Sequence, residues 1–318
     1  MQEYVTEASG ATETEDVAKE VYNRSGGNPL FMSETVRLLV EERELVSDRA
    51  VRGTKGTIRI PDGIREVIGR RLSRLSEECN RVLTTASVVG REFSTDILKS
   101  LLEDMSGDRL LDVVEEAMEV RVVEELPDVY GRYRFSHALT QQTLIEELSM
   151  TRRTRLHARV AEAMEEMYGA DAEAHVFEMV EHFANAEIVL GSERLIRYLL
   201  LAGKKSLDRY ANEQALDYFK RGLEAKEGSA MDEETADLHF GLGRAQAEMA
   251  DAEALENVRA AFDFYEKHGC HEKMVAVAAF PTYSVGPLVE SREWLKHACE
   301  RCLELVPDGS LAAGRLLA

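Results

Sequence analysis

Residues 120–135 have the sequence VRVVEELPDVYGRYRF, and this stretch decides the fold of the region around it. Residues 120–126 are β-branched and half alternating between apolar and polar side chains, and a second short run follows at 132–135. Between them, Pro127 and Gly131 supply the residue types that favour turns. The pattern predicts two short strands joined by a five-residue loop, which is a β-hairpin.

Helical patterns lie on both sides of the predicted hairpin. They are Ile64–Leu75, Glu77–Val88, Thr95–Leu102 and Asp108–Met118 before it, and His137–Leu148 after it. Helices followed by a hairpin are the arrangement of a winged helix. We therefore expect a winged-helix domain over residues 60–168 in a chain that is otherwise mostly α-helical.

The last part of the chain predicts an α-solenoid of tetratricopeptide-like helix pairs over residues 169–318. Gly203 is followed by Ala215 and Phe219 at offsets +12 and +16, which are typical of a tetratricopeptide unit. We expect Ala215 and Phe219 to lie between the two helices of that unit. A second pair is predicted to open at Leu242-Gly243, about 40 residues later. Further members of the pattern are Ala261, Phe262, Met274–Phe280, Arg292–Leu305 and the cut-short helix Leu311–Ala318.

The composition excludes some classes of function. The 318 residues include 39 Lys and Arg against 59 Asp and Glu, for a net charge of −20. Such a chain is poorly suited to binding nucleic acid or an anionic membrane, because neutralising phosphates needs clustered cations. The N-terminal residues are acidic and lack an apolar h-region, so we expect no signal peptide, and no apolar run approaches the roughly 20 residues of a membrane helix. We expect a cytoplasmic protein without a membrane partner.

The helix before the hairpin, where recognition helices sit, is acidic, which disfavours direct DNA binding. Its charged residues are Asp108, Asp112, Glu115, Glu116 and Glu119, opposed by Arg109. Two arginine-rich patches are typical of solvated faces, or could pair with the acidic repeats or with an ATPase domain. They consist of Arg65, Arg70, Arg71 and Arg74, and of Arg152, Arg153, Arg155 and Arg159.

The sequence contains no catalytic constellation. Gly203-Lys-Lys-Ser206 lacks the earlier glycine and the preceding strand of a phosphate-binding loop. Cys299 and Cys302 form a C-x-x-C pair, which could bind a metal with nearby residues. Those residues are His268, Cys270, His271 and His297. The helical spacing of the two cysteines favours core packing instead, and we expect no metal.

Residues 25–31, SGGNPLF, contain a helix start, with Asn28 as N-cap and Pro29 at the first helical position. Together with Ser33-Glu34 and Leu38-Leu39, the segment resembles the "GGNPLF-x-x-E" segment of signal-transduction ATPases with numerous domains. These AAA-related switches occur in large LuxR-type regulators and multidomain adenylate cyclases. The resemblance covers about residues 12–225 and continues in IPDGIREVIGRRL (60–72), ASVVGREF (86–93), RFSHAL (134–139) and RLHARVA (155–161).

The resemblance implies a helical lid fragment of an AAA-type ATPase over residues 1–59, followed by the winged helix and the repeats. The family's lid proline packs on adenine, and its winged-helix histidine approaches the phosphates of bound ADP. The matching positions are Pro29 and His137, and we group Asn28 with them as cofactor-binding candidates. The resemblance thereby implies that His137→Ala weakens closure over ADP, and we expect it to leave the melting temperature of this chain nearly unchanged.

The family's α/β domain, with its Walker motifs, has no counterpart among these residues. We therefore expect no cofactor and no enzymatic activity in this chain, with ATP or ADP bound by the complete protein and an ATPase domain supplied in cis or in trans. The expected function is the regulatory and protein-interaction arm of a nucleotide-dependent signalling switch, in transcription or cyclase regulation. The repeats would receive a protein or small-molecule inducer. The alternatives are a tetratricopeptide scaffold without switching and a DNA-binding winged-helix transcription regulator.

Overall fold

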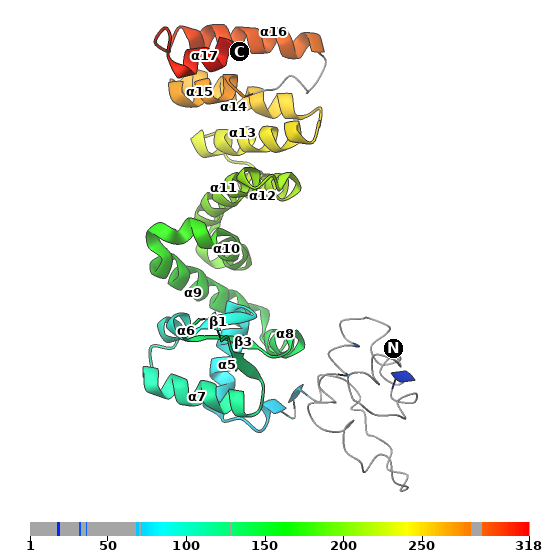
Figure 1. The fold of residues 1–318 in the computed structure, drawn as a ribbon, viewed down its shortest axis with the longest axis vertical. Helices are drawn as coiled ribbons and strands as arrows, with labels where there is room; N and C mark the ends of the chain where they lie inside the picture. Colours follow the sequence, from blue (N-terminus) through cyan, green and yellow to red (C-terminus); the bar gives the residue numbers. More distant parts are fainter. Residues whose placement is uncertain are drawn as a thin grey trace. The chain divides into compact units, whose positions relative to one another are not determined.

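The computed structural model describes residues 71–127, 129–280 and 288–317, together with the isolated positions 18, 19, 32, 36, 68 and 69 (Figure 1). The described part is mostly α-helical and contains a three-stranded antiparallel sheet, which confirms the predicted fold class. The chain divides into two compact units, Met1–Ala163 and Met164–Ala318. The predicted lid lies outside the described residues except at isolated positions, and the predicted boundaries after residues 59 and 168 stay predictions.

The first unit contains helices and strands in the order expected of a winged helix. They are α5 (Glu77–Val89), β1 (Glu92–Ser94), α6 (Thr95–Leu101), α7 (Gly107–Glu119), β2 (Val123–Glu125), β3 (Arg132–Phe135) and α8 (Ala138–Glu146). The hydroxyls of Ser76, Ser94 and Ser106 each accept a hydrogen bond from the backbone N–H three residues later. A serine at this position satisfies a donor that the first helical turn leaves unpaired. These three serines therefore set where α5, α6 and α7 begin.

The sheet has the strand order β1-β3-β2, and both pairs are antiparallel. The predicted hairpin is confirmed as β2 and β3, in which Val123 is paired with Phe135. The sequence does not predict β1, because a three-residue strand is too short to show alternation. In β1, Phe93 is paired with Tyr133, and its buried ring lies 5.4 Å from the ring of Phe135. β1 thereby anchors the hairpin on the core of the unit.

The second unit consists of helices that pack on their sequence neighbours, as the predicted helix pairs require. α11 packs on α12, α12 on α13 and α13 on α14, and α11 also contacts α13. The division between the units falls within α9 (Met150–Tyr168). The elements that follow are η1 (Gly169–His175), α10 (Val176–Leu190), α11 (Ser192–Asp208), α12 (Asn212–Ala225), α13 (Glu233–Glu248), α14 (Ala254–His268), α15 (His271–Ala278), α16 (Leu288–Leu303) and α17 (Leu311–Leu317). Among the described helices, none is long and apolar enough to cross a lipid bilayer.

The first helix of the second pair begins earlier than the sequence predicts. The sequence predicts that this helix begins at Leu242-Gly243. These residues instead lie inside α13, which begins at Glu233. The carboxylate of Asp232 accepts a 2.8 Å hydrogen bond from the backbone N–H of Thr235 and so caps the helix. The small residues of the repeat pattern therefore lie in the interior of the first helix of each pair, as Gly203 does in α11.

Phe219 of α12 joins three helices. Phe219 and Ala215 are both completely buried, which confirms their predicted place between the helices of one pair. The ring of Phe219 packs on Gly203 of α11 and also on Gly241 of α13. A Cβ atom added to Gly203 would lie 2.5 Å from the ring, and one added to Gly241 would lie 2.4 Å from it. The same ring thus connects one helix pair to the next.

The carboxylate of Asp237 in α13 connects three other helices. The Tyr265 hydroxyl of α14 and the Lys273 ammonium of α15 each donate a 2.5 Å hydrogen bond to its Oδ1. The ammonium of Lys204 in α11 lies 3.9 Å from Oδ2. Burial, together with the bond to Asp237, raises the pKa of Tyr265. With its side chain only 17% exposed, Asp237 is a stronger link than an ordinary surface ion pair.

We expect Phe219→Ala to lower the free energy of unfolding of the second unit by about 3–5 kcal/mol, the range for emptying a buried aromatic site. The ring contacts helices from two pairs, so its removal opens a space between α11, α12 and α13. Thermal and urea unfolding followed by circular dichroism measure the effect. An unchanged midpoint would contradict the packing described above.

Two glycine-to-alanine substitutions distinguish the effect of this packing on stability from the effect of helix propensity. Alanine is favoured over glycine in a helix interior by about 1 kcal/mol. In α17, a Cβ added to Gly314 meets nothing within 4 Å, so Gly314→Ala should be neutral or stabilising. Gly241→Ala places its new Cβ against the ring of Phe219 and should destabilise the unit. Equal effects of the two substitutions would show that the ring does not limit the approach of the helices.

Candidate functional site

His137 lies at the junction between β3 and α8, where the sequence places it. It directly precedes α8, its backbone is extended, and its carbonyl accepts a 3.1 Å hydrogen bond from the Thr140 N–H. The N–H of the preceding Ser136 donates to the carbonyl of Val122 at 3.0 Å. α8 is in turn held on α5, where the Gln141 amide donates to the Ser87 carbonyl at 2.9 Å. The junction is therefore fixed on both sides of the histidine.

The side chain of His137 is only 1% exposed. The expectation that His137→Ala leaves the melting temperature nearly unchanged does not fit this burial, because truncating a buried side chain removes its packing. The phosphate-sensing role of His137 stays a prediction. Asn28 and Pro29, the other two candidate nucleotide contacts, lie outside the described residues.

Gly203-Lys-Lys-Ser206 does not form a phosphate-binding loop. Gly203-Lys-Lys-Ser206, the stretch nearest in sequence to a phosphate-binding loop, lies inside α11, and Gly203 packs on Phe219. A helix binds phosphate at its N-terminus, where backbone N–H groups are unpaired, whereas N–H groups within a helix are already bonded.

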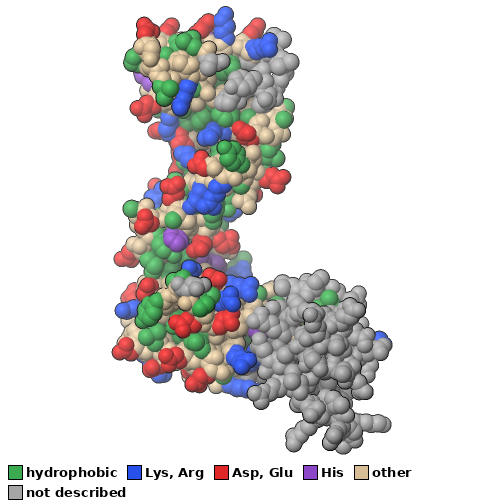
Figure 2. Space-filling model, in the orientation of Figure 1, with side chains coloured by type: hydrophobic (Ala, Val, Ile, Leu, Met, Phe, Trp, Pro, Cys, Tyr) green, Lys and Arg blue, Asp and Glu red, His purple; other side chains and the backbone are tan. Residues whose placement is uncertain are grey.

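α7 exposes acidic side chains where a DNA-reading winged helix exposes cations (Figures 1 and 2). Its arginine, Arg109, donates two hydrogen bonds of 2.9 and 2.6 Å to Glu78 of α5. Glu116 accepts bonds from the backbone N–H and the hydroxyl of Ser76, at 2.6 and 2.8 Å. The exposed acidic residues are Asp108, Asp112, Glu115 and Glu119. This face repels phosphates, and its single cation is already paired within the domain.

An arginine stripe runs along the first half of α9. Arg152, Arg155, Leu156 and Arg159 have the spacing i, i+3, i+4, i+7 and share one face of the helix. In an amphipathic helix this stripe is usually apolar. The first two arginines also lie near the helix N-terminus, where the macrodipole disfavours cations by about 0.3–1 kcal/mol each. Helix stability therefore does not explain why arginines occupy these positions.

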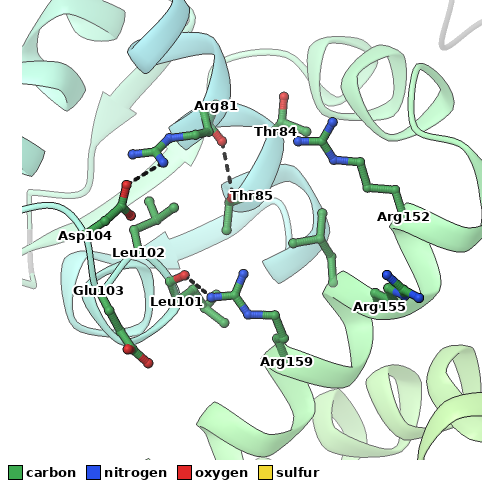
Figure 3. A pocket seen from close by; sticks show the side chains of 11 residues that line it. Arg81, Thr84, Thr85, Leu101, Leu102, Glu103, Asp104, Arg152, Arg155 and Arg159 are labelled. Carbon is green, nitrogen blue, oxygen red and sulfur yellow. Dashed lines mark hydrogen bonds and ion pairs between the residues drawn. The ribbon is translucent and has the colours of Figure 1, made fainter.

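The arginine stripe forms one wall of a pocket of about 520 Å³ in the first unit (Figure 3). The other walls are α5 and the segment that leads from the end of α6 toward α7. The lining residues are Arg81, Thr84, Thr85, Leu101, Leu102, Glu103, Asp104, Arg152, Arg155, Leu156 and Arg159. Four arginines against two carboxylates leave the lining positive, although the chain as a whole carries −20.

Two of the pocket arginines are bonded within its walls and two are not. Arg81 donates a 2.6 Å hydrogen bond to Asp104, which lowers the pKa of that carboxyl. Arg159 donates to the backbone carbonyl of Leu101, at the end of α6. The side chains of Arg152 and Arg155 have no hydrogen-bond or ion-pair partner among the described residues. Figure 3 shows Arg152 extending from α9 toward Thr84 on α5.

The sequence identifies this arginine cluster but not the pocket. It places Arg153 with Arg152, Arg155 and Arg159, whereas Arg153 does not line the pocket. The helical spacing i, i+3, i+7 is the sequence signal that separates Arg152, Arg155 and Arg159 from Arg153. In the other predicted patch, Arg71 is only 7% exposed, so the prediction that it lies on a solvated face is wrong for this residue. The remaining residues of that patch, except Arg74, lie outside the described part.

The C-x-x-C pair packs in the core of the second unit, as its helical spacing predicts. Cys302 is fully buried, and the Cys299 thiol donates to the Ala278 carbonyl at 3.7 Å. Burial, with the neighbouring Cys299, raises the pKa of Cys302 to about 11. Within the described ranges, no three His, Cys, Asp or Glu side chains are placed to hold a metal ion.

Comparison with known proteins identifies one distant relative. A 202-residue stretch, 63% of this chain, is 25% identical to an uncharacterized protein of Rhizobium meliloti (strain 1021). The match spans 19% of the length of that protein. No protein-family model matches the chain. No solved structure matches it.

We expect His137→Ala to lower the free energy of unfolding of the first unit by about 1–3 kcal/mol, because it removes a buried polar side chain and its contacts. Gln142→Ala is the control, since Gln142 is an exposed residue of the adjoining α8 whose side chain donates a 2.8 Å hydrogen bond to Glu146. Thermal unfolding followed by circular dichroism compares the two variants. Equal melting temperatures would contradict a packing role for His137.

Proposed function

We propose that this chain is the regulatory and protein-interaction arm of a nucleotide-dependent signalling switch, of the kind that controls transcription or cyclase activity. The observation that carries the proposal is the acidic face of α7, whose Arg109 is bonded to Glu78. A winged helix with this face is suited to contact a protein and poorly suited to contact DNA. The order of SGGNPLF, winged helix and helix pairs supports the nucleotide switch through its resemblance to signal-transduction ATPases.

In this proposal the lid and the winged helix hold a separate ATPase domain in its ADP-bound state. That domain is supplied in cis or in trans, and the helix pairs receive a protein or small-molecule inducer. A switch of this kind works only if the contacts differ between its two states by a few kcal/mol. The winged helix supplies a surface of defined charge for one of these states, and the helix pairs supply a second surface that an inducer can reach.

The repeats by themselves would also support a scaffold without switching. A scaffold binds its partners without changing their nucleotide affinity, whereas a switch arm must change it. A DNA-binding regulator is the third reading, and the acidic α7 opposes it. The three functions therefore differ in what they do to bound ADP and to DNA, and these are measurable.

We expect the chain to slow the dissociation of fluorescent ADP from its ATPase domain by about tenfold or more. His137→Ala should reduce this effect more than Thr143→Ala does. Thr143 is the control because it is a buried polar residue of the same helix, whose hydroxyl donates to the Leu139 carbonyl at 2.8 Å. An unchanged ADP dissociation rate would leave a scaffold as the better description, and equal losses in the two variants would make His137 structural.

We also expect the purified chain to show no steady ATP turnover, because Gly203-Lys-Lys-Ser206 lies inside α11 and, among the described residues, no three His, Cys, Asp or Glu side chains are placed to hold a metal ion. Turnover that persists through further purification and is lost on mutation of the chain would contradict this. In the same preparation, a salt-dependent mobility shift with duplex DNA would favour the DNA-binding regulator instead.

A further inference from the structure

The pocket between α5, α9 and the α6–α7 segment has the chemistry of an anion site. Arg152 and Arg155 project from α9 without a carboxylate partner among the described residues. Guanidinium groups match phosphate geometry, because their fixed N–H donors bind two oxygens at once. The positive end of the α9 dipole adds to the same field. Two guanidinium groups without a partner among the described residues therefore line one pocket.

We propose that this pocket binds a small phosphate-bearing ligand. Its volume of about 520 Å³ lies within the range of small-molecule sites, roughly 300–1,000 Å³. Phosphate oxygens would lie on Arg152 and Arg155, while Leu101, Leu102 and Leu156 give the site apolar surface. A long acidic peptide would need an extended groove, whereas these residues line a single pocket.

The two carboxylates of the pocket restrict the ligand further. Asp104 is already bonded to Arg81, so its charge is balanced within the wall. Glu103 is exposed, and Figure 3 shows it across the pocket from the arginines of α9. A carboxylate at that end repels a second phosphate and accepts hydrogen bonds. The lining therefore favours a ligand with phosphate at one end and hydroxyl or amino donors at the other.

The test is isothermal titration calorimetry of the full chain with ribose 5-phosphate, and separately with inorganic pyrophosphate, at low ionic strength. We expect saturable binding of ribose 5-phosphate that Arg152→Gln weakens by about tenfold or more, the loss typical of a charge-assisted hydrogen bond. Arg153→Gln removes the same charge from the adjacent position of α9 but lies outside the pocket. It should weaken binding by less than about twofold, since screening limits distant charges.

Three results would overturn the proposal. The first is that neither ribose 5-phosphate nor pyrophosphate binds at any concentration tested. The second is equal weakening by Arg152→Gln and Arg153→Gln, which would show diffuse attraction instead of a site. Tighter binding of single-stranded DNA or polyglutamate, with the same dependence on Arg152, would assign the arginines to a macromolecule. Arg152 and Arg155 are exposed and unpaired among the described residues, so the folded state should persist in these variants and melting curves should coincide. None of these outcomes depends on the proposed switch function.

Discussion

The second unit depends on how closely its helices approach one another around the ring of Phe219. The ring occupies space that side chains at Gly203 and Gly241 would need. Each glycine costs its helix about 1 kcal/mol relative to alanine, whereas burying an aromatic side chain stabilises by about 1.5–3 kcal/mol. In the next pair, Gly243 makes the same kind of approach to Val258. Gly203, Gly241 and Gly243 therefore set the distances between helices, and they are not points of flexibility.

The net charge of −20 does not decide the electrostatics of any one site. Charges separated by more than about 10 Å are screened at 0.1 M salt, so a side chain responds mainly to its neighbours. Asp237 draws Tyr265 and Lys273 into one partly buried cluster. In the first unit, the arginines on α9 make a positive pocket in an acidic protein. Local arrangement, and not overall composition, therefore separates acidic from basic surfaces here.

Residue patterns could predict much of the fold, because the features involved are local. The hairpin, the helix order and the buried positions of Ala215 and Phe219 follow from short-range periodicity. β1 escapes prediction because its three residues become a strand only by pairing with β3. The pocket cannot be predicted from the sequence for the same reason, since Arg81 and Arg152 line it together only through the packing of distant segments. The burial of His137 likewise depends on tertiary packing that no motif contains.

The arginine pocket and the acidic face of α7 are connected through the segment between α6 and α7. Asp104 in this segment bonds to Arg81, and the Leu101 carbonyl at the end of α6 accepts a bond from Arg159. A phosphate on Arg152 and Arg155 would also attract Arg81 and Arg159, which line the same pocket, and so act on the segment that leads into α7. A ligand shifts such an equilibrium only as far as its affinity differs between the two conformations. Attraction to the phosphate supplies that difference in a conformation where it draws Arg81 away from Asp104 or Arg159 away from the Leu101 carbonyl. The positive pocket and the acidic face of α7 can therefore be coupled through the segment between α6 and α7.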